Sequence, residues 1–134
     1  MPGAPTIEGI FGPLGAAVMR IVWEVGEATV ADVAAALRRT QGRAHAYTTI
    51  MTVMSRLHDR GVLLRRRVGQ RYVYRAAADE SALIDRLSGQ AVDQLLARYG
   101  TSALRQFAQR LDEVDPALRA QLLSLADRER SQTG

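Results

Sequence analysis

Apolar residues recur at helical spacing in the middle of the chain. Between Tyr47 and Arg60, four of them fall at positions i, i+3, i+4 and i+7: Ile50, Val53, Met54 and Leu57. This spacing predicts an amphipathic helix over 47–60 with one buried side. Gly61 follows, where a left-handed residue commonly ends a helix. The other side of the helix collects hydroxyl groups and one arginine, and it carries no carboxylate before Asp59.

Two shorter helices are predicted before this one. Pro13 suits a first helical position and precedes an apolar stripe of Leu14, Val18, Ile21, Val22 and Val25. Thr29 and Asp32 have the spacing of a capping box, and they open a second helix with the apolar residues Val30, Val33 and Leu37. Residues 1–12 are rich in proline and glycine, so they are expected to form a flexible arm.

The pattern changes to short β-favouring runs after the central helix. The runs 62–67 and 71–75 flank a turn that contains glycine, which predicts a β-hairpin. Tyr72 and Tyr74 share one face and are expected in the core, whereas Arg71 lies on the other face near the tip. The three consecutive arginines 65–67 alternate between faces, so at most some of them can contact one ligand.

Helical spacing returns after the hairpin and predicts three more amphipathic helices, beginning near residues 79, 101 and 115. Thr101 or Ser102 is expected to cap the second of them. Three short helices bury little surface alone, so pairing with a second copy is expected. The interface should contain the apolar residues of these helices: Leu83, Leu87, Leu95, Leu104, Phe107, Leu111, Leu118, Leu122 and Leu125.

The predicted fold is therefore mainly α with a small β-hairpin. Three helices followed by an arginine-rich hairpin is the element order of a winged helix-turn-helix domain. The expected organisation is an arm (1–12), a winged-helix DNA-binding domain (13–77), a three-helix dimerisation domain (78–130) and a tail (131–134).

Charge is divided unevenly between the two halves. All 18 basic side chains are arginines, and the net charge is +4. Residues 1–75 hold 11 arginines and five acidic residues, whereas residues 76–134 hold seven arginines and nine acidic residues. The first part thus carries +6 and the second −2, which predicts that only the first part meets nucleic acid.

Residue types for catalysis or metal binding are scarce. The chain has no cysteine, and neither of its two histidines has a partner at zinc-ligand spacing. No phosphate loop or nucleophile motif is present. We therefore expect no enzyme activity, metal or cofactor. Without a signal peptide or a membrane-spanning run, a cytoplasmic protein that does not insert into the membrane is expected.

The polar side of the central helix is the candidate DNA-binding surface. Hydroxyl groups and amides near its N-terminus could bind phosphate or base edges, and those one turn further could read bases. The expected contacts are Tyr47, Thr48, Thr49, Thr52, Ser55 and Arg56, with Arg71 in the hairpin. Alternatively, this side is an ordinary solvated surface, with Arg56 paired to Asp59 or Asp32. A winged-helix protein–protein adaptor is the competing function.

The sequence resembles the penicillinase repressor family (the BlaI/MecI/CopY type) from about Leu14 to Leu125. The resemblance is carried by Ala17-Val18-Met19 with Val22-Trp23, by Ala46-Tyr47-Thr48-Thr49-Ile50-Met51-Thr52-Val53 with Arg56-Leu57 and Gly61, and by Gly69 with Arg71-Tyr72-Val73-Tyr74. It implies a bacterial homodimeric transcriptional repressor that binds an inverted-repeat operator. Residues matching the DNA-contacting positions of the family are Thr48, Thr49, Thr52, Arg56 and Arg71.

The resemblance also implies a route of derepression. Family members are commonly cleaved within their C-terminal helices after a membrane sensor-protease detects a β-lactam. The cleaved bond precedes a phenylalanine, and the matching bond here is Gln106-Phe107, where the family often has asparagine before the phenylalanine. The copper-responsive branch uses a cysteine pair near its C-terminus, which this chain lacks.

Overall fold

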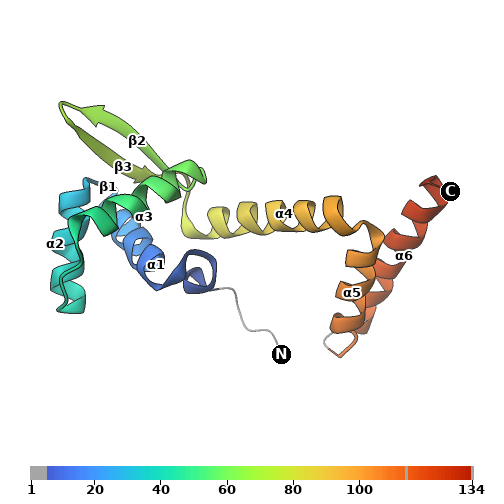
Figure 1. Ribbon diagram of the computed structural model, residues 1–134. Helices are drawn as coiled ribbons and strands as arrows, with labels where there is room; N and C mark the ends of the chain where they lie inside the picture. The colour runs from blue at the N-terminus through green and yellow to red at the C-terminus, as the bar shows by residue number, and fades with distance from the viewer. Residues whose placement is uncertain (1–5, 114, 134) are drawn as a thin grey trace. The chain divides into compact units, whose positions relative to one another are not determined.

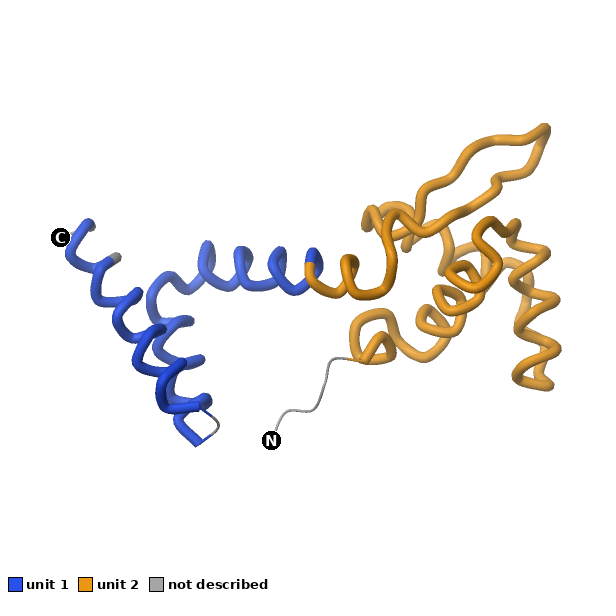
Figure 2. Tube along the Cα trace, turned by 180° about the vertical axis from the view of Figure 1, so that it is seen from behind, with its two compact units in different colours: residues 1–3, 86–134 blue, residues 4–85 orange. Residues whose placement is uncertain are grey.

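The computed structural model describes residues 6–113 and 115–133, apart from the side chains of residues 129 and 133. In this part the chain forms helices and a small sheet (Figure 1), which confirms the predicted mainly α fold with a winged helix-turn-helix. The elements are α1 (Ile7–Val25), β1 (Glu27–Ala28), α2 (Val30–Gln41), α3 (Tyr47–Asp59), β2 (Leu63–Val68), β3 (Arg71–Ala76), α4 (Glu80–Tyr99), α5 (Thr101–Leu111) and α6 (Pro116–Thr133). The described residues fall into two compact units that meet within α4, one up to residue 85 and the other from residue 86 onward (Figure 2).

The first helix begins earlier than the sequence predicts. Thr6 caps it by accepting a hydrogen bond from the amide of Gly9 at 3.3 Å, and Ile7 is buried. The backbone leaves helical geometry only at Gly12, whose φ is 76°, and resumes it at Pro13. A flexible arm over 1–12 is therefore wrong for residues 7–11, because the cap and the burial of Ile7 stabilise a helical turn there. Residues 1–5 lie outside the described part.

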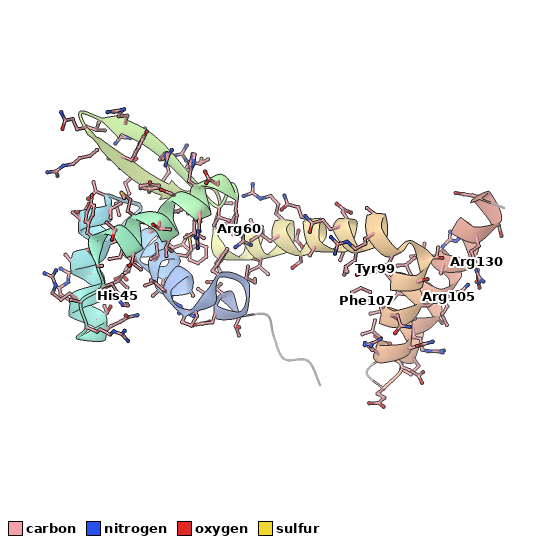
Figure 3. All side chains as sticks on the ribbon, in the orientation of Figure 1. His45, Arg60, Tyr99, Arg105, Phe107 and Arg130 are labelled. Atoms are coloured by element: carbon pink, nitrogen blue, oxygen red, sulfur yellow. The ribbon has the colours of Figure 1, made fainter. Side chains whose placement is uncertain are left out.

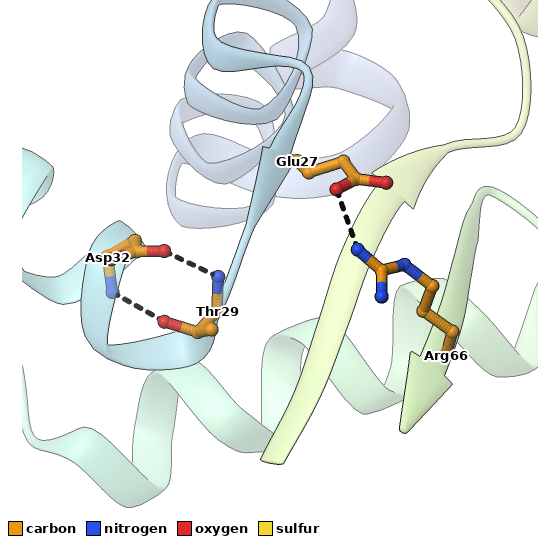
Figure 4. A network of polar contacts seen from close by, with 4 residues as sticks. All are labelled: Glu27, Thr29, Asp32 and Arg66. Carbon is orange, nitrogen blue, oxygen red and sulfur yellow. Dashed lines mark hydrogen bonds and ion pairs between the residues drawn. The ribbon is translucent and has the colours of Figure 1, made fainter. Parts of the chain in front are cut away.

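The predicted caps of α2 and α3 are confirmed. Thr29 accepts a hydrogen bond from the Asp32 amide at 3.1 Å, and the Asp32 carboxylate accepts one from the Thr29 amide at 2.9 Å (Figure 4). These bonds lower the pKa of Asp32. At the end of α3, Gly61 has a φ of 76°, and the amide of Val62 donates to the Leu57 carbonyl at 2.9 Å. This arrangement is a Schellman motif, which satisfies the terminal carbonyl groups of the helix.

The sheet contains a strand that the sequence did not reveal. Its order is β1-β3-β2, both pairs are antiparallel, and β1 has only two residues. Gly69 has a φ of 63° and directly follows β2 in the turn to β3, as a tight hairpin with a glycine first turn residue requires. Glu27 of β1 forms an ion pair with Arg66 of β2 at 3.0 Å (Figure 4), so β1 is tied to the hairpin as well as paired with β3.

The core of the N-terminal unit fixes the orientation of α3. Ile50 and Met54 are completely buried and Leu57 nearly so, which confirms the predicted stripe. Tyr74 is also buried, but Tyr72 is 39% exposed. The expectation that both tyrosines are core residues is therefore wrong for Tyr72, because the hairpin extends beyond the packed core.

Helix α4 begins in the N-terminal unit. Asp79 caps it, with its carboxylate accepting a hydrogen bond from the Ala82 amide at 2.8 Å. Leu83 is completely buried in this unit. The expectation that Leu83 contacts a second copy stays a prediction, and in the single chain its side chain is already covered within the N-terminal unit.

The C-terminal unit contains the second half of α4 together with α5 and α6. Asp115 accepts hydrogen bonds from the amides of Ala117 and Leu118, at 3.1 and 3.2 Å, so the predicted start of α6 is confirmed.

Two expectations for this unit are wrong. Helix α5 begins after Gly100 without a side-chain cap, so the expected cap by Thr101 or Ser102 is wrong. The expected tail from residue 131 is wrong up to Thr133, because α6 continues there and the Ser131 hydroxyl donates to the Asp127 carbonyl at 3.1 Å. Residue 134 lies outside the described part.

We expect Thr29→Ala to lower the free energy of unfolding by about 1 kcal/mol, since it leaves a helix N-terminal amide without its acceptor. Urea unfolding followed by circular dichroism measures the change. Thr29→Ser keeps the hydroxyl and should stay within about 0.5 kcal/mol of the wild type. Equal losses in both variants would contradict the role of the capping box.

Candidate nucleic-acid interface

The polar side of α3 is open to solvent. Thr48, Thr49, Thr52 and Arg56 are exposed, Tyr47 is 55% exposed, and Ser55 is half-buried. Burial of the opposite stripe holds these residues outward, so the structure brings all six predicted α3 residues to one open side of the helix. The first carboxylate along the helix is that of Asp59, its last residue.

One of the exposed hydroxyl groups has a partner within the helix. Thr52 Oγ1 donates to the Thr48 carbonyl at 2.9 Å. A hydroxyl has one hydrogen and two lone pairs, so Thr52 keeps its ability to accept. It can therefore accept a hydrogen bond from the exocyclic amino group of adenine or cytosine in the major groove.

The N-terminus of α3 is open to an anion. Ala46 occupies the cap position and provides no side-chain hydrogen bond, in contrast to Thr29 of α2. The first amides of a helix lack intrahelical partners, and they favour negative charge together with the helix dipole. Thr48 and Thr49 add hydroxyl groups at this end. His45, labelled in Figure 3, lies just before the helix, and its Nε2 forms a hydrogen bond with Gln41 Oε1 at 2.9 Å.

Arg56 is not neutralised by a carboxylate. It is exposed, and within the described part of the chain it forms no ion pair. The pairing with Asp59 or Asp32 that the sequence left open is therefore not observed. Arg60, one turn later and labelled in Figure 3, instead lies over a ring of α1: its Cζ is 5.5 Å from the centroid of Phe11. Arg56 keeps a full positive charge on the open side of α3.

The hairpin, or wing, adds further positive charge. Arg71 is the first residue of β3 and is exposed, without an ion pair among the described residues. It also contributes, after the hydrogen bonds to Thr29, to the lowered pKa of Asp32. Arg66 differs because its charge is balanced by Glu27.

Sequence reasoning missed one residue of this surface. Met51 is 42% exposed on α3 although it is apolar. The helical pattern could have revealed it, because Met51 falls outside the stripe of Ile50, Met54 and Leu57 and precedes Thr52. An apolar side chain at this place can contact the methyl group of thymine.

The bond Gln106-Phe107 lies inside α5. Both residues are exposed, and Phe107 lines a groove of about 460 Å³ with Leu95 and Tyr99. Figure 3 labels Phe107 on α5 and Tyr99 at the end of α4. The Gln106 carbonyl belongs to this bond and accepts a hydrogen bond from Arg110 Nη1 at 3.2 Å. The bond is thus held in helical geometry.

Other kinds of site find no support in the described residues. No group of three or more histidine, cysteine or acidic side chains there could hold a metal ion. No helix within the same residues is both long and apolar enough to cross a membrane.

Comparison with known proteins identifies the family. The family model described as Penicillinase repressor matches residues 11–128, which include α3, the wing and all three C-terminal helices up to residue 128. A search of curated proteins gave no match. Because the family match covers most of the chain, the protein belongs to the penicillinase repressor family, whose members are DNA-binding transcriptional repressors and not enzymes.

Proposed function

We propose that the protein is a homodimeric repressor that binds an inverted-repeat operator through α3 and the wing. The observation that carries this proposal is the exposed side of α3. It combines hydroxyl groups with Arg56, which has no ion pair among the residues that the structure describes, and it has no carboxylate before its last residue. A polyanion fits such a surface, whereas a protein partner would need apolar or acidic groups. The competing adaptor function finds no acidic side chain on this side before Asp59 and only two exposed apolar or aromatic side chains, Tyr47 and Met51.

In the proposed complex, α3 lies in the major groove of each half-site. Amides and hydroxyl groups at its N-terminus bind a phosphate. Met51, Thr52 and Ser55 face the base edges, where Thr52 accepts a hydrogen bond and Met51 contacts a methyl group. Arg56 binds a phosphate or a guanine. Arg71 of the wing binds the flanking backbone, as in other winged-helix proteins.

The C-terminal unit supports the proposal of a dimer. Its only buried side chains among the described residues are the alanines 103, 108 and 126. Several large apolar side chains remain exposed there: Val92, Leu95, Tyr99, Phe107, Leu118 and Leu125. Exposed apolar groups of this kind are typical of protein–protein interfaces. A second copy with two-fold symmetry would cover them, and it would present two α3 helices to half-sites about 34 Å apart.

Repression ends, in this proposal, when a signal disrupts the C-terminal unit. Cleavage at Gln106-Phe107 by a membrane sensor-protease is such a signal. The bond lies within α5, so α5 must unwind locally before a protease can bind it as an extended chain. A cut there separates α6 from the rest of the unit and removes the apolar residues Leu118 and Leu125 from the dimer.

We expect wild-type affinity for DNA to fall steeply with salt, and Arg71→Ala to weaken binding to every sequence about tenfold. Loss of one phosphate contact should reduce the slope of log K against log salt by about 1. Fluorescence anisotropy with a fragment of the protein's own promoter region and with a random duplex measures both effects. Arg128→Ala removes the same charge from α6 and is the matched control. An equal loss in this control would contradict a wing contact.

We expect Thr52→Val to reduce the preference for operator over random DNA by about tenfold, because the variant keeps the shape and a methyl group but loses the acceptor. Affinity for random DNA should stay unchanged. The same binding assay measures the ratio. Thr40→Val is the matched control, since the Thr40 hydroxyl donates to the Ala36 carbonyl in the same way, at 2.9 Å. Equal losses on operator and random DNA would refute base reading by Thr52.

We expect Leu125→Asp to weaken self-association at least tenfold, because it places a charge in the proposed dimer interface. Sedimentation velocity over a range of protein concentrations measures the monomer–dimer equilibrium. Val25→Asp is the control, since Val25 is 57% exposed in the N-terminal unit and Leu125 is 47% exposed. A dimer that tolerates Leu125→Asp as well as Val25→Asp would contradict the proposed interface.

A further inference from the structure

One face of the wing holds two arginines against a single aromatic ring. The register of the hairpin pairs Arg65 with Tyr74 and Arg67 with Tyr72, so the four side chains share a face. The Cζ atom of Arg65 lies 4.1 Å from the centroid of the Tyr72 ring, and that of Arg67 lies 5.9 Å from it. Tyr72 is therefore a shared support for two guanidinium groups at the protein surface.

Each guanidinium is also anchored by a hydrogen bond. Arg65 Nη1 donates to the hydroxyl of the buried Tyr74 at 3.4 Å, and this bond raises the pKa of Arg65. Arg67 Nε donates to the Gly69 carbonyl at 3.1 Å. A guanidinium has five N–H donors, so most donors of both groups remain available to a ligand.

No carboxylate neutralises this pair. Within the described residues, neither Arg65 nor Arg67 forms an ion pair, and Asp59 acts on Arg65 only through its weak field. Arg66, between them in sequence, points to the other face and is paired with Glu27 (Figure 4). The wing thus holds two like charges together, at an electrostatic cost that an anion would remove.

The position of the pair indicates which anion it fits. Arg71 pairs with Val68 on the opposite face of the hairpin, so both faces of the wing carry an arginine that has no ion pair with any described residue. A groove of DNA is lined by a phosphate backbone on each side, and arginine forks match phosphate geometry. A hairpin placed edge-on in a groove would therefore meet phosphates on both of its faces.

We propose that Arg65 and Arg67 bind phosphates of one DNA strand while Arg71 contacts the other strand across the groove. Tyr72 is a positioning residue that holds both guanidinium groups and need not touch DNA itself. This inference rests on the proposed function, because it assigns further contacts to the same DNA complex.

The test measures the affinity of the full chain for a random 30-base-pair duplex by fluorescence anisotropy. The measurement is repeated between about 50 and 200 mM salt, where phosphate contacts have a large effect on affinity. Arg65→Gln and Arg67→Gln should each weaken binding about tenfold and reduce the salt slope by about 1. Tyr72→Leu should do the same without removing a charge. Tyr72→Phe keeps the ring and should bind as the wild type does.

Arg66→Gln is the matched control, since it removes an equal charge from the same strand but from the face that Glu27 neutralises. It should leave the slope nearly unchanged. Equal slopes for Arg66→Gln and Arg67→Gln would overturn the proposal. An unchanged slope in Tyr72→Leu, with circular dichroism confirming the fold, would overturn the role of Tyr72. If Tyr72→Leu does not fold, the arginine variants alone decide. An unchanged salt slope in both Arg65→Gln and Arg67→Gln would then overturn the proposed phosphate contacts. A wild-type protein without salt-dependent binding would instead contradict the proposed function.

Discussion

The proposed DNA-binding surface depends on the burial of three side chains of α3. Ile50 and Met54 are fully buried and Leu57 is 3% exposed, and burying such side chains stabilises a protein by about 1.5–3 kcal/mol each. A rotation of α3 by one residue, about 100°, would expose part of this stripe and turn the threonines toward the core. The packing therefore fixes both the helix and the set of side chains that a ligand meets.

Local interactions explain why much of this fold could be predicted. The capping box of Thr29 and Asp32, the glycine at position 61 and the stripe on α3 each involve residues a few positions apart. The misses involve distant residues. Strand β1 has two residues and exists because β3 pairs with it, and no pattern in Glu27-Ala28 indicates this. The turn at Ile7 is stabilised by burial, which outweighs the glycines around it.

The candidate site was predictable to a similar extent. The hydroxyl-rich side of α3 follows directly from helical spacing, and Met51 could have been found in the same way. Which arginines of the wing are neutralised by a carboxylate could not be predicted. Strand alternation separates Arg66 from Arg65 and Arg67, but its neutralisation depends on Glu27, which is 39 positions away. Alternation likewise places Tyr72 with Tyr74, but the extent of the core decides that only Tyr74 is buried.

The two units differ in the size of the side chains that they bury, and this difference indicates which unit a regulatory signal can disrupt. The N-terminal unit has its own core of large side chains, whereas the C-terminal unit buries only alanines among its described residues. If the C-terminal unit forms the dimer as proposed, its disruption leaves two intact DNA-binding units that are no longer linked. Linkage of two binding modules can raise overall affinity by about 10²–10⁴. A signal that acts only on the C-terminal helices could then release the protein from the operator without changing any residue proposed to contact DNA.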